Sequence, residues 1–508
     1  MRNWRKRHFL AVVFLCDMIG TLSAAGIDES EPLLRRNITD YGVKCDAVTD
    51  NTDAFAAMES RAPVDGILAT PANGVCVGKY VITRAHRSLF LNAGSSIKCP
   101  PSSACDAITV NAAYVTIDGP GTVDGNRANV TSSIGIQING GLGASHVSIR
   151  GITVAHAKNN GKMHGYGIQA IDVPYLDVEN IHVTDTGGIG VFTNIKGYAD
   201  VPGLRLQGIQ CDRTAEGIGA MAGCIFAYNN SGHGIGSYFY TNAIIAGNSV
   251  HCPIGQTGNY VCLTAQGLKN SIYKNNATTG SQLGHSIVSS DNVQISNNSA
   301  YAFTFYGLEM SRVTHSIARG TRCDGSDAGL AGQHCVVLDG STSHVAIDDT
   351  RAVSILSDVI MATPSGGAST LTDIAINGTV GTAPRGKSCI FLQNIRNFSV
   401  SGGDCDGAHL GGNYGVRLIN SFPGRVSQFN GHDLEHGVAI NGSNGTAIDD
   451  IAIGPDNFVN VPQPVSAAYV GGAACGTHIT VDEPMAAKGE EISYSDFCNR
   501  VAAPAQRK

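Results

Sequence analysis

Acidic side chains at strand-like spacing are the first candidates for chemistry in this sequence. Glu309 stands in Gly307-Leu308-Glu309-Met310, where a strand would point Leu308 and Met310 inward and Glu309 outward. Asp172 ends a similar short segment earlier in the chain. Two carboxyl groups on one surface can donate and accept protons while a bond is cleaved. Glu309 and Asp172 are therefore predicted catalytic residues.

The longest irregular interval, residues 207–234, holds a second group of candidates. A repeat protein projects such an interval as a loop over one face. Asp212 and Glu216 are predicted catalytic carboxylates there, and Arg213 is predicted to bind substrate. A Gly-His-Gly fragment offers His233 as an acid or base, although the same fragment is ordinary turn sequence.

Basic and aromatic side chains gather on one predicted turn, at Lys162, His164 and Tyr166. β-Elimination and epimerisation need a base that removes the proton beside a carboxylate, and a group that neutralises that carboxylate. His164 is a predicted catalytic residue, and a plain polar turn is the alternative for this segment. The predicted substrate-binding residues are Lys162, Tyr166, Arg213, Arg312 and Tyr238.

A short repeat must position these residues. Gly followed by a short apolar run recurs, as in Gly167-Ile168 and Gly190-Val191, and Val416 and Val438 head similar runs 22 residues apart. A period of 20–30 residues built from short strands with period-2 alternation indicates a β-solenoid rather than a helical repeat. Asn recurs near the predicted corners, where stacked amides or left-handed backbone are expected. These corner residues include Asn248, Asn275, Asn276, Asn297 and Asn298.

Composition agrees with a turn-rich β protein. Gly is 63 of 508 residues, charged residues are 15% and aromatic residues are 6%. Residues 1–25 have a basic start, an apolar run and small residues, which is typical of a secretory signal. Without them the chain keeps 30 Lys and Arg against 40 Asp and Glu, a net charge of −10. Such a charge disfavours nucleic-acid binding, and no later segment is long and apolar enough to span a membrane.

Cysteine usage also predicts a secreted or periplasmic protein. Fourteen Cys remain after residue 25, and none forms a Cys-x-x-Cys pair, so disulfides are favoured over a zinc site. In chain order the neighbouring couples are 45 with 76, 99 with 105, 211 with 224, 252 with 262, 323 with 335, 389 with 405, and 475 with 498. Connectivity does not follow from the sequence alone.

The start of the repeat resembles the pectate-lyase-like superfamily. Asp40-Tyr41-Gly42, then Asp46-Ala47-Val48-Thr49-Asp50-Asn51-Thr52, is similar to its opening motif, with Ala47 in place of the usual Gly. The segment from Gly119 to Asn126 is similar to a coil element of that superfamily. The resemblance spans roughly residues 37–460 and implies an all-β, single-stranded right-handed parallel β-helix (a solenoid). Thr52 or Asp53 is predicted as the N-cap of a short helix through Ala54–Met58, and this helix would cover the N-terminal end of the solenoid.

The expected organisation follows from this fold. Residues 1–25 are a signal peptide, 26–106 an N-terminal cap with the first coils, 107–460 the parallel β-helix, and 461–508 a C-terminal cap or tail.

The resemblance implies function only coarsely, because this superfamily holds lyases, hydrolases, epimerases, tailspikes and adhesins. The Trp-containing pectate lyase motif is absent, since the one Trp is Trp4, and the polygalacturonase motifs are incomplete. A secreted enzyme that hydrolyses or eliminates a polysaccharide or oligosaccharide is the leading hypothesis. A uronan epimerase or intramolecular glycosyl transferase is one alternative, and a non-enzymatic glycan-binding solenoid is another. No cofactor is predicted. Binding of Ca²⁺ is compatible with the sequence, although no Ca²⁺ site and no metal ligands are recognisable in it. The sequence does not indicate an oligomeric state.

Overall fold

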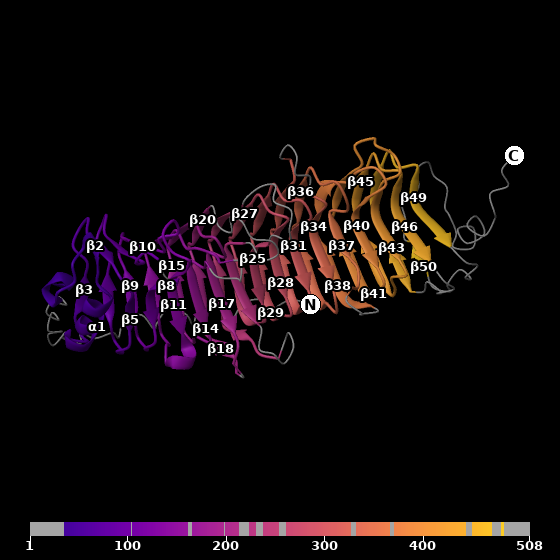
Figure 1. Ribbon diagram of the computed structural model, residues 1–508. Coiled ribbons are helices and arrows are strands. Elements are labelled where there is room, and N and C mark those ends of the chain that lie inside the picture. The colour runs from indigo at the N-terminus through magenta and orange to yellow at the C-terminus, as the bar shows by residue number, and fades with distance from the viewer. Residues whose placement is uncertain are drawn as a thin grey trace, which may run out of the picture.

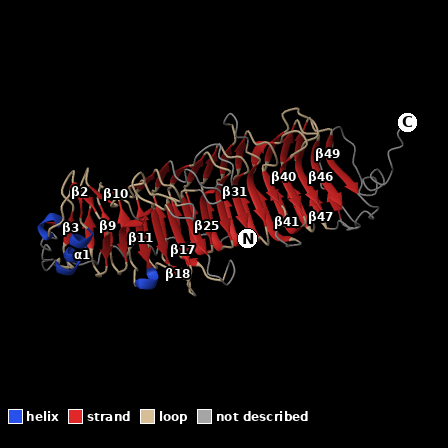
Figure 2. Ribbon diagram, in the orientation of Figure 1, coloured by secondary structure: helices blue, strands red, loops and turns tan. Residues whose placement is uncertain are grey.

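The protein is a stack of short parallel strands. The computed structural model describes residues 35–481 except 103, 161–164, 198, 213–222, 230–236, 253–260, 327–331, 366–369, 443–449 and 470–478. Its strands lie side by side along one elongated body (Figures 1 and 2). They form three parallel sheets, here called A, B and C, of 19, 16 and 15 strands. This is the all-β parallel solenoid that the sequence predicts.

Each coil visits the three sheets in turn. One coil passes through β8 (Ala104–Val110) in sheet C, β9 (Thr116–Asp118) in sheet A and β10 (Thr122–Asp124) in sheet B. Sheet C positions the candidate site. Its strands are β5 (Tyr80–Ile82), β8 (Ala104–Val110), β11 (Ser132–Asn139), β14 (Ile168–Ile171), β17 (Val191–Ile195), β21 (Ile225–Asn229), β25 (Val261–Gln266), β28 (Leu283–Val288), β31 (Tyr306–Ser311), β34 (His334–Asp339), β37 (Ile360–Ala362), β40 (Ser388–Gln393), β43 (Tyr414–Ile419), β46 (His436–Gly442) and β49 (Gln463–Tyr469).

The pairing register confirms the predicted period. Ile168 pairs with Val191 and Val416 pairs with Val438, each one coil apart. Inward residues of all three sheets form one continuous apolar core that runs from Ile38 to Val461. Removing this aliphatic surface from water supplies the main driving force for stacking the coils.

Asparagine shapes the corner between sheets A and B. Asn248 Nδ2 donates to Asn276 Oδ1 at 2.9 Å, and Asn276 Nδ2 donates to Asn298 Oδ1 at 3.1 Å. All three side chains are buried. The preceding residues Asn275 and Asn297 have φ of 54° and 52°, in the left-handed region that Asn tolerates. Both expected uses of Asn at the corners are therefore present.

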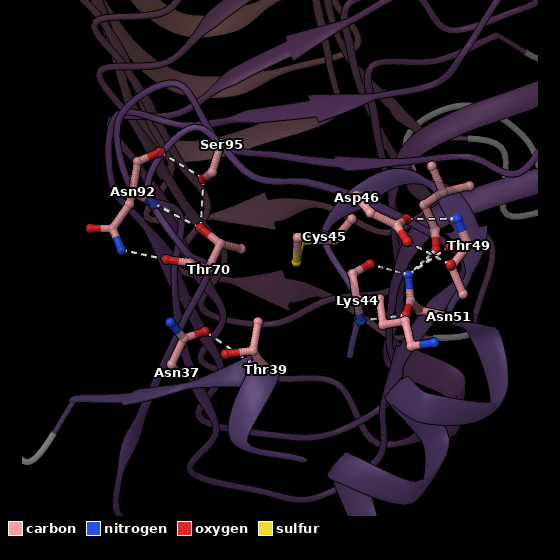
Figure 3. Close-up of a disulfide and its surroundings, with 12 residues drawn as sticks. Asn37, Thr39, Lys44, Cys45, Asp46, Thr49, Asn51, Thr70, Asn92 and Ser95 are labelled. Atoms are coloured by element: carbon pink, nitrogen blue, oxygen red, sulfur yellow. Dashed lines mark hydrogen bonds between the residues drawn. A yellow bond between two sulfur atoms is a disulfide. The ribbon is translucent and has the colours of Figure 1, made fainter. Parts of the chain in front are cut away.

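Helix α1 (Thr52–Arg61) covers the N-terminal end of the stack, at the indigo end of Figure 1. It buries Phe55 and Met58 against the first coils. The predicted N-cap at Thr52 or Asp53 is wrong, because the N-cap residue is Asn51. The Asn51 amide instead donates to backbone carbonyls, among them that of Lys44 at 2.6 Å, beside Cys45 (Figure 3).

Six disulfides join the neighbouring couples of cysteines: Cys45–Cys76, Cys99–Cys105, Cys211–Cys224, Cys252–Cys262, Cys323–Cys335 and Cys389–Cys405. The seventh couple, Cys475 with Cys498, and the predicted signal peptide lie outside the described residues. Within the described part of the chain, no helix has the length and apolar character to cross a membrane.

Candidate functional site

The outward face of sheet C carries a row of side chains, one from each coil. Backbone pairing aligns Thr264, Ser286, Glu309, Val337 and Met361 on β25, β28, β31, β34 and β37. Glu309 points outward as predicted, because its neighbours Leu308 and Met310 are fully buried in the core. Ser286 Oγ donates to Glu309 Oε2 at 2.6 Å. The row therefore holds a carboxylate fixed by a hydroxyl from the adjacent coil.

The environment of Glu309 favours its protonated form. Burial raises the pKa of this carboxyl above its usual value, and the negative charge of Asp339 raises it further. The Ser286 hydrogen bond and the Arg312 guanidinium act in the opposite direction and do not cancel the increase. Glu309 is therefore suited to hold a proton that it can donate.

Asp339 supplies a second carboxylate on the same face. The register places it one coil beyond Glu309 and two residues along the strand, which separates the two Cα atoms by about 8 Å. Its Oδ2 accepts a hydrogen bond from Ser365 Oγ at 3.0 Å. Its Oδ1 is buried and has no hydrogen-bond partner among the described residues. A buried carboxylate oxygen without a partner is costly, and binding a ligand hydroxyl or water would remove that cost.

Two rings flank the carboxylates. Tyr306 begins the strand of Glu309, and burial together with the charges of Glu309 and Asp339 raises its pKa. The Tyr306 and His334 ring centroids are 5.8 Å apart on adjacent coils. His334 Nδ1 donates to the Asp358 carbonyl at 3.0 Å, and burial lowers the pKa of this imidazole. His334 is therefore kept neutral, with its proton on Nδ1.

Aromatic residues line the same face on both sides of the carboxylates. Toward the N-terminus, an apolar cluster separate from the solenoid core packs Ile134, Tyr166, Ile189, Phe192 and Phe226. In it the Tyr166 and Phe192 rings stack at 4.9 Å. Toward the C-terminus, the Arg417 guanidinium lies over the Tyr414 ring at 5.0 Å, and Tyr414 stacks on His436 at 4.7 Å.

A polar cavity of about 540 Å³ opens on the N-terminal part of sheet C. Its lining includes a cation, a carboxylate and several amides and hydroxyls, namely Lys79, Asp106, Thr109, Gln137 and Gln169. The face therefore offers polar and aromatic contacts over many coils, which suits an extended ligand better than a compact one.

Solved structures with this architecture are known. The tailspike protein of E. coli bacteriophage HK620 in complex with a pentasaccharide has a TM-score of 0.52 and 11% identity, over 88% of this chain and 80% of the tailspike. The likeness decides the fold. The chain is a right-handed parallel β-helix of the pectin-lyase type.

Other pectin-lyase-type β-helices match less closely in shape. The mannuronan C-5 epimerase AlgE4 A-module of Azotobacter vinelandii has a TM-score of 0.37 and 14% identity, over 88% of this chain and all of the module. The exopolygalacturonase of Thermotoga maritima has a TM-score of 0.33 and 12% identity, over 84% and 92%. No protein-family model and no curated protein sequence matches this chain.

On this β-helix the predicted pair of Glu309 and Asp172 is not assembled. Asp172 follows β14, five strand spacings from β31, or about 24 Å. A carboxylate pair that acts on one glycosidic bond lies within about 10 Å. Asp172 Oδ1 instead accepts hydrogen bonds from the backbone of Lys196 and Gly197, at 2.7 and 2.9 Å. Its observed contacts are those of a corner residue.

Asp212 also lies away from Glu309. Its predicted place in a loop is wrong, because it ends strand β20 (Gln210–Asp212) of sheet B. Cys211 points inward to its disulfide, so alternation turns Asp212 outward, where its Oδ2 lies 3.1 Å from His182 Nε2. Asp212 and Glu309 therefore occupy different sheets of the solenoid.

The predicted substrate-binding residues lie in different parts of the structure. Arg312 follows β31, and its charge acts on Glu309. Tyr166 is buried in the outer apolar cluster, and Tyr238 lies half-buried two residues before β22 (Tyr240–Thr241). The remaining predicted residues lie outside the described part of the chain: Lys162, His164, Arg213, Glu216 and His233.

Sequence reasoning missed Asp339 and His334 as site residues. Leu308 pairs with Val336, so this coil is longer than the 22- or 23-residue period used to align the repeat. The pattern that could have indicated Asp339 is the apolar segment Cys335-Val336-Val337-Leu338, which is followed directly by this carboxylate.

Proposed function

We propose that the protein hydrolyses a polysaccharide or oligosaccharide on the outward face of sheet C. The observation that carries the proposal is the pair of Glu309, whose pKa is raised, and Asp339, whose buried Oδ1 has no hydrogen-bond partner in the described part of the chain. Glycoside hydrolysis uses two such carboxyl groups, one protonated and one ionised. The bound pentasaccharide of the similarly folded tailspike is consistent with a glycan ligand.

Each carboxyl has a defined role in the proposed reaction. Glu309 donates its proton to the glycosidic oxygen as the bond to the anomeric carbon breaks. Asp339 accepts a proton from the water whose oxygen forms the new bond to that carbon. This water attacks the anomeric carbon directly, on the face of the sugar ring opposite to the leaving group. The proposed reaction therefore inverts the anomeric configuration.

The charges at the site favour hydrolysis over elimination. β-Elimination from a uronate needs cations that neutralise the substrate carboxylate. Around Glu309 the carboxylate of Asp339 adds negative charge, and among the described residues Arg312 is the cation whose charge acts on Glu309. A neutral glycan is therefore the expected substrate, and lyase or epimerase activity is an alternative outcome of the test.

Secretion is part of the same proposal. Six disulfides are typical of proteins that fold in an oxidising compartment, and the first 25 residues have the pattern of a signal peptide. Recovery of the processed protein from the culture medium or periplasm would support it. Retention of residues 1–25 in a cytoplasmic product would contradict it.

The decisive experiment is a panel of neutral and acidic polysaccharides incubated with wild type and Glu309→Gln. We expect new reducing ends from a neutral polymer, without the ultraviolet absorbance of an unsaturated product. Loss of the general acid should reduce the rate by about 10²–10⁴-fold. Glu179→Gln is the matched control, because Glu179 lies outward on β15 (Asp177–Glu179) of sheet A beside Arg150.

Three outcomes would replace the hydrolase proposal. Unsaturated products indicate a lyase, and altered uronate stereochemistry without cleavage indicates an epimerase. Binding without any change to the polymer indicates a glycan-binding solenoid.

A further inference from the structure

A second cluster of ionisable side chains lies on sheet B, near the C-terminal end of the described coils. Strand β42 (Asp404–Asp406) points Asp404 and Asp406 outward, and strand β45 (Asn430–His432) pairs His432 with Asp406. Asp433 follows β45 with a φ of 56°. One ligand atom each from Asp406, His432 and Asp433 lies within 4.8 Å of the other two.

Three histidine–aspartate pairs elsewhere on the solenoid are in direct hydrogen-bond contact. His315 and Asp291 approach to 2.9 Å, His344 and Asp373 to 3.0 Å, and His182 and Asp212 to 3.1 Å. Each is the length of a direct hydrogen bond.

His432 Nδ1, in contrast, lies 3.5 Å from Asp406 Oδ1 and 3.9 Å from Asp433 Oδ2. These separations are too long for hydrogen bonds. Two ligands of one tetrahedral zinc ion, each about 2.0–2.1 Å from the metal, lie about 3.4 Å apart. The three atoms are thus spaced like ligands around a common centre.

Neighbouring groups orient each of the three side chains. His432 Nε2 lies 3.3 Å from Asp404 Oδ1, so the carboxylate can hold the Nε2 proton and leave Nδ1 with its lone pair. The Ala408 amide donates to Asp406 Oδ1 at 2.7 Å. Asn460 Nδ2 donates to Asp433 Oδ1 at 3.1 Å, which leaves Oδ2 on the side of His432. Such outer contacts commonly orient metal ligands.

We propose that Asp406, His432 and Asp433 bind a divalent transition-metal ion, with zinc as the best match. An imidazole with two carboxylates suits zinc better than the all-oxygen sites that calcium prefers. The ion would join the coils of β42 and β45. Asn460, the residue after β48 (Asn457–Val459), would connect the next coil to the site through its hydrogen bond to Asp433. The ion would therefore stabilise the C-terminal coils, on a different sheet from Glu309.

Zinc titration of the full-length protein tests the proposal. After treatment with a chelator, calorimetry with ZnCl₂ near pH 7.5 should show one zinc per chain that His432→Gln removes. Asp406→Asn and Asp433→Asn should each weaken binding at least about tenfold. The control His315→Gln, on sheet A, should leave the affinity unchanged. Zinc should also raise the thermal unfolding midpoint of wild type but not of His432→Gln.

Anomalous scattering from a zinc-soaked crystal provides a readout that does not depend on how the variants fold. A peak between β42 and β45 is expected. The absence of that peak, or zinc binding that His432→Gln retains in full, would overturn the proposal. Neither result depends on whether the protein cleaves a glycan.

Discussion

Sheets A and C use outward acidic residues in different ways. On sheet A, half-buried aspartates pair across coils with exposed arginines, as in Arg150 Nη2 with Asp177 Oδ2 at 2.5 Å and Arg319 Nε with Asp348 Oδ2 at 2.9 Å. On sheet C, Glu309 is half-buried, bonded to a serine and adjacent to another carboxylate. Exposed pairs contribute about 0–1 kcal/mol each. A carboxyl group whose pKa is raised by burial and by a neighbouring like charge has the properties of a functional group.

The largest expected effect is the loss of the second carboxylate. Asp339→Asn removes the proposed base, so the rate of glycan cleavage should fall about 10²–10⁴-fold. Asp348→Asn on strand β35 (Ser343–Asp348) of sheet A is the matched control, because Asp348 lies on a different sheet and is paired with the cation of Arg319. Initial rates on the polymer identified by the panel provide the measurement. Equal rates for the two variants would remove Asp339 from the mechanism.

The alternation of strand residues explains why part of this contrast is predictable. Gly307-Leu308-Glu309-Met310 fixes which side chains face the core, so the outward position of Glu309 follows from the sequence alone. Partners across coils depend on register. The sequence predicts Asp172 as a second catalytic carboxylate because it ends an equivalent short segment, yet Asp172 has the corner conformation with φ of 53°. Asp339 reaches Glu309 only through a coil of irregular length.

The proposed metal ligands illustrate the same limit. No metal-binding spacing is visible in the sequence, because Asp406 and His432 belong to different coils. Only the pairing of β42 with β45 brings them together. Residues within one strand can be placed from the pattern, whereas sites that span coils require the register.

A smaller effect concerns the inner side of the same coils. Where β25 and β31 place Leu263 and Leu308, β28 places His285, which is fully buried. Tyr273 Oη donates to His285 Nδ1 at 2.7 Å, and Nε2 donates to the Ser299 carbonyl at 2.9 Å. Burial lowers the pKa of His285 from its usual value of 6.5 to about 4. The unfolded chain therefore binds this proton more readily than the folded chain.

Stability associated with His285 is thus complete above pH 6.5 and declines as the pH falls toward 4. The loss amounts to about 3 kcal/mol of unfolding free energy. The double variant Tyr273→Phe/His285→Leu should lack this decline, whereas Tyr273→Phe alone should keep a decline. Urea unfolding followed by circular dichroism at pH 7 and pH 4.5 measures it. An equal decline in wild type and the double variant would assign acid sensitivity to other groups.

The smallest effect tests the contact between Ser286 and Glu309. The Ser286 hydrogen bond lowers the pKa of Glu309 against the larger effect of burial. Ser286→Ala should therefore raise that pKa by less than about one unit, since one unit corresponds to about 1.4 kcal/mol and a single hydrogen bond contributes about that much. An acid catalyst would then stay protonated to higher pH, so the alkaline limb of the rate profile should move to higher pH.

The limb that moves also distinguishes the two roles available to Glu309. If Glu309 were the base, the acidic limb would move to higher pH and the alkaline limb would stay in place. Thr264→Ala is the control, because Thr264 lies on the same row but one coil beyond Ser286. A profile unchanged by Ser286→Ala, with normal folding, would show that this hydrogen bond does not set the protonation of the catalytic group. The contrast with sheet A would then rest on burial and Asp339 alone.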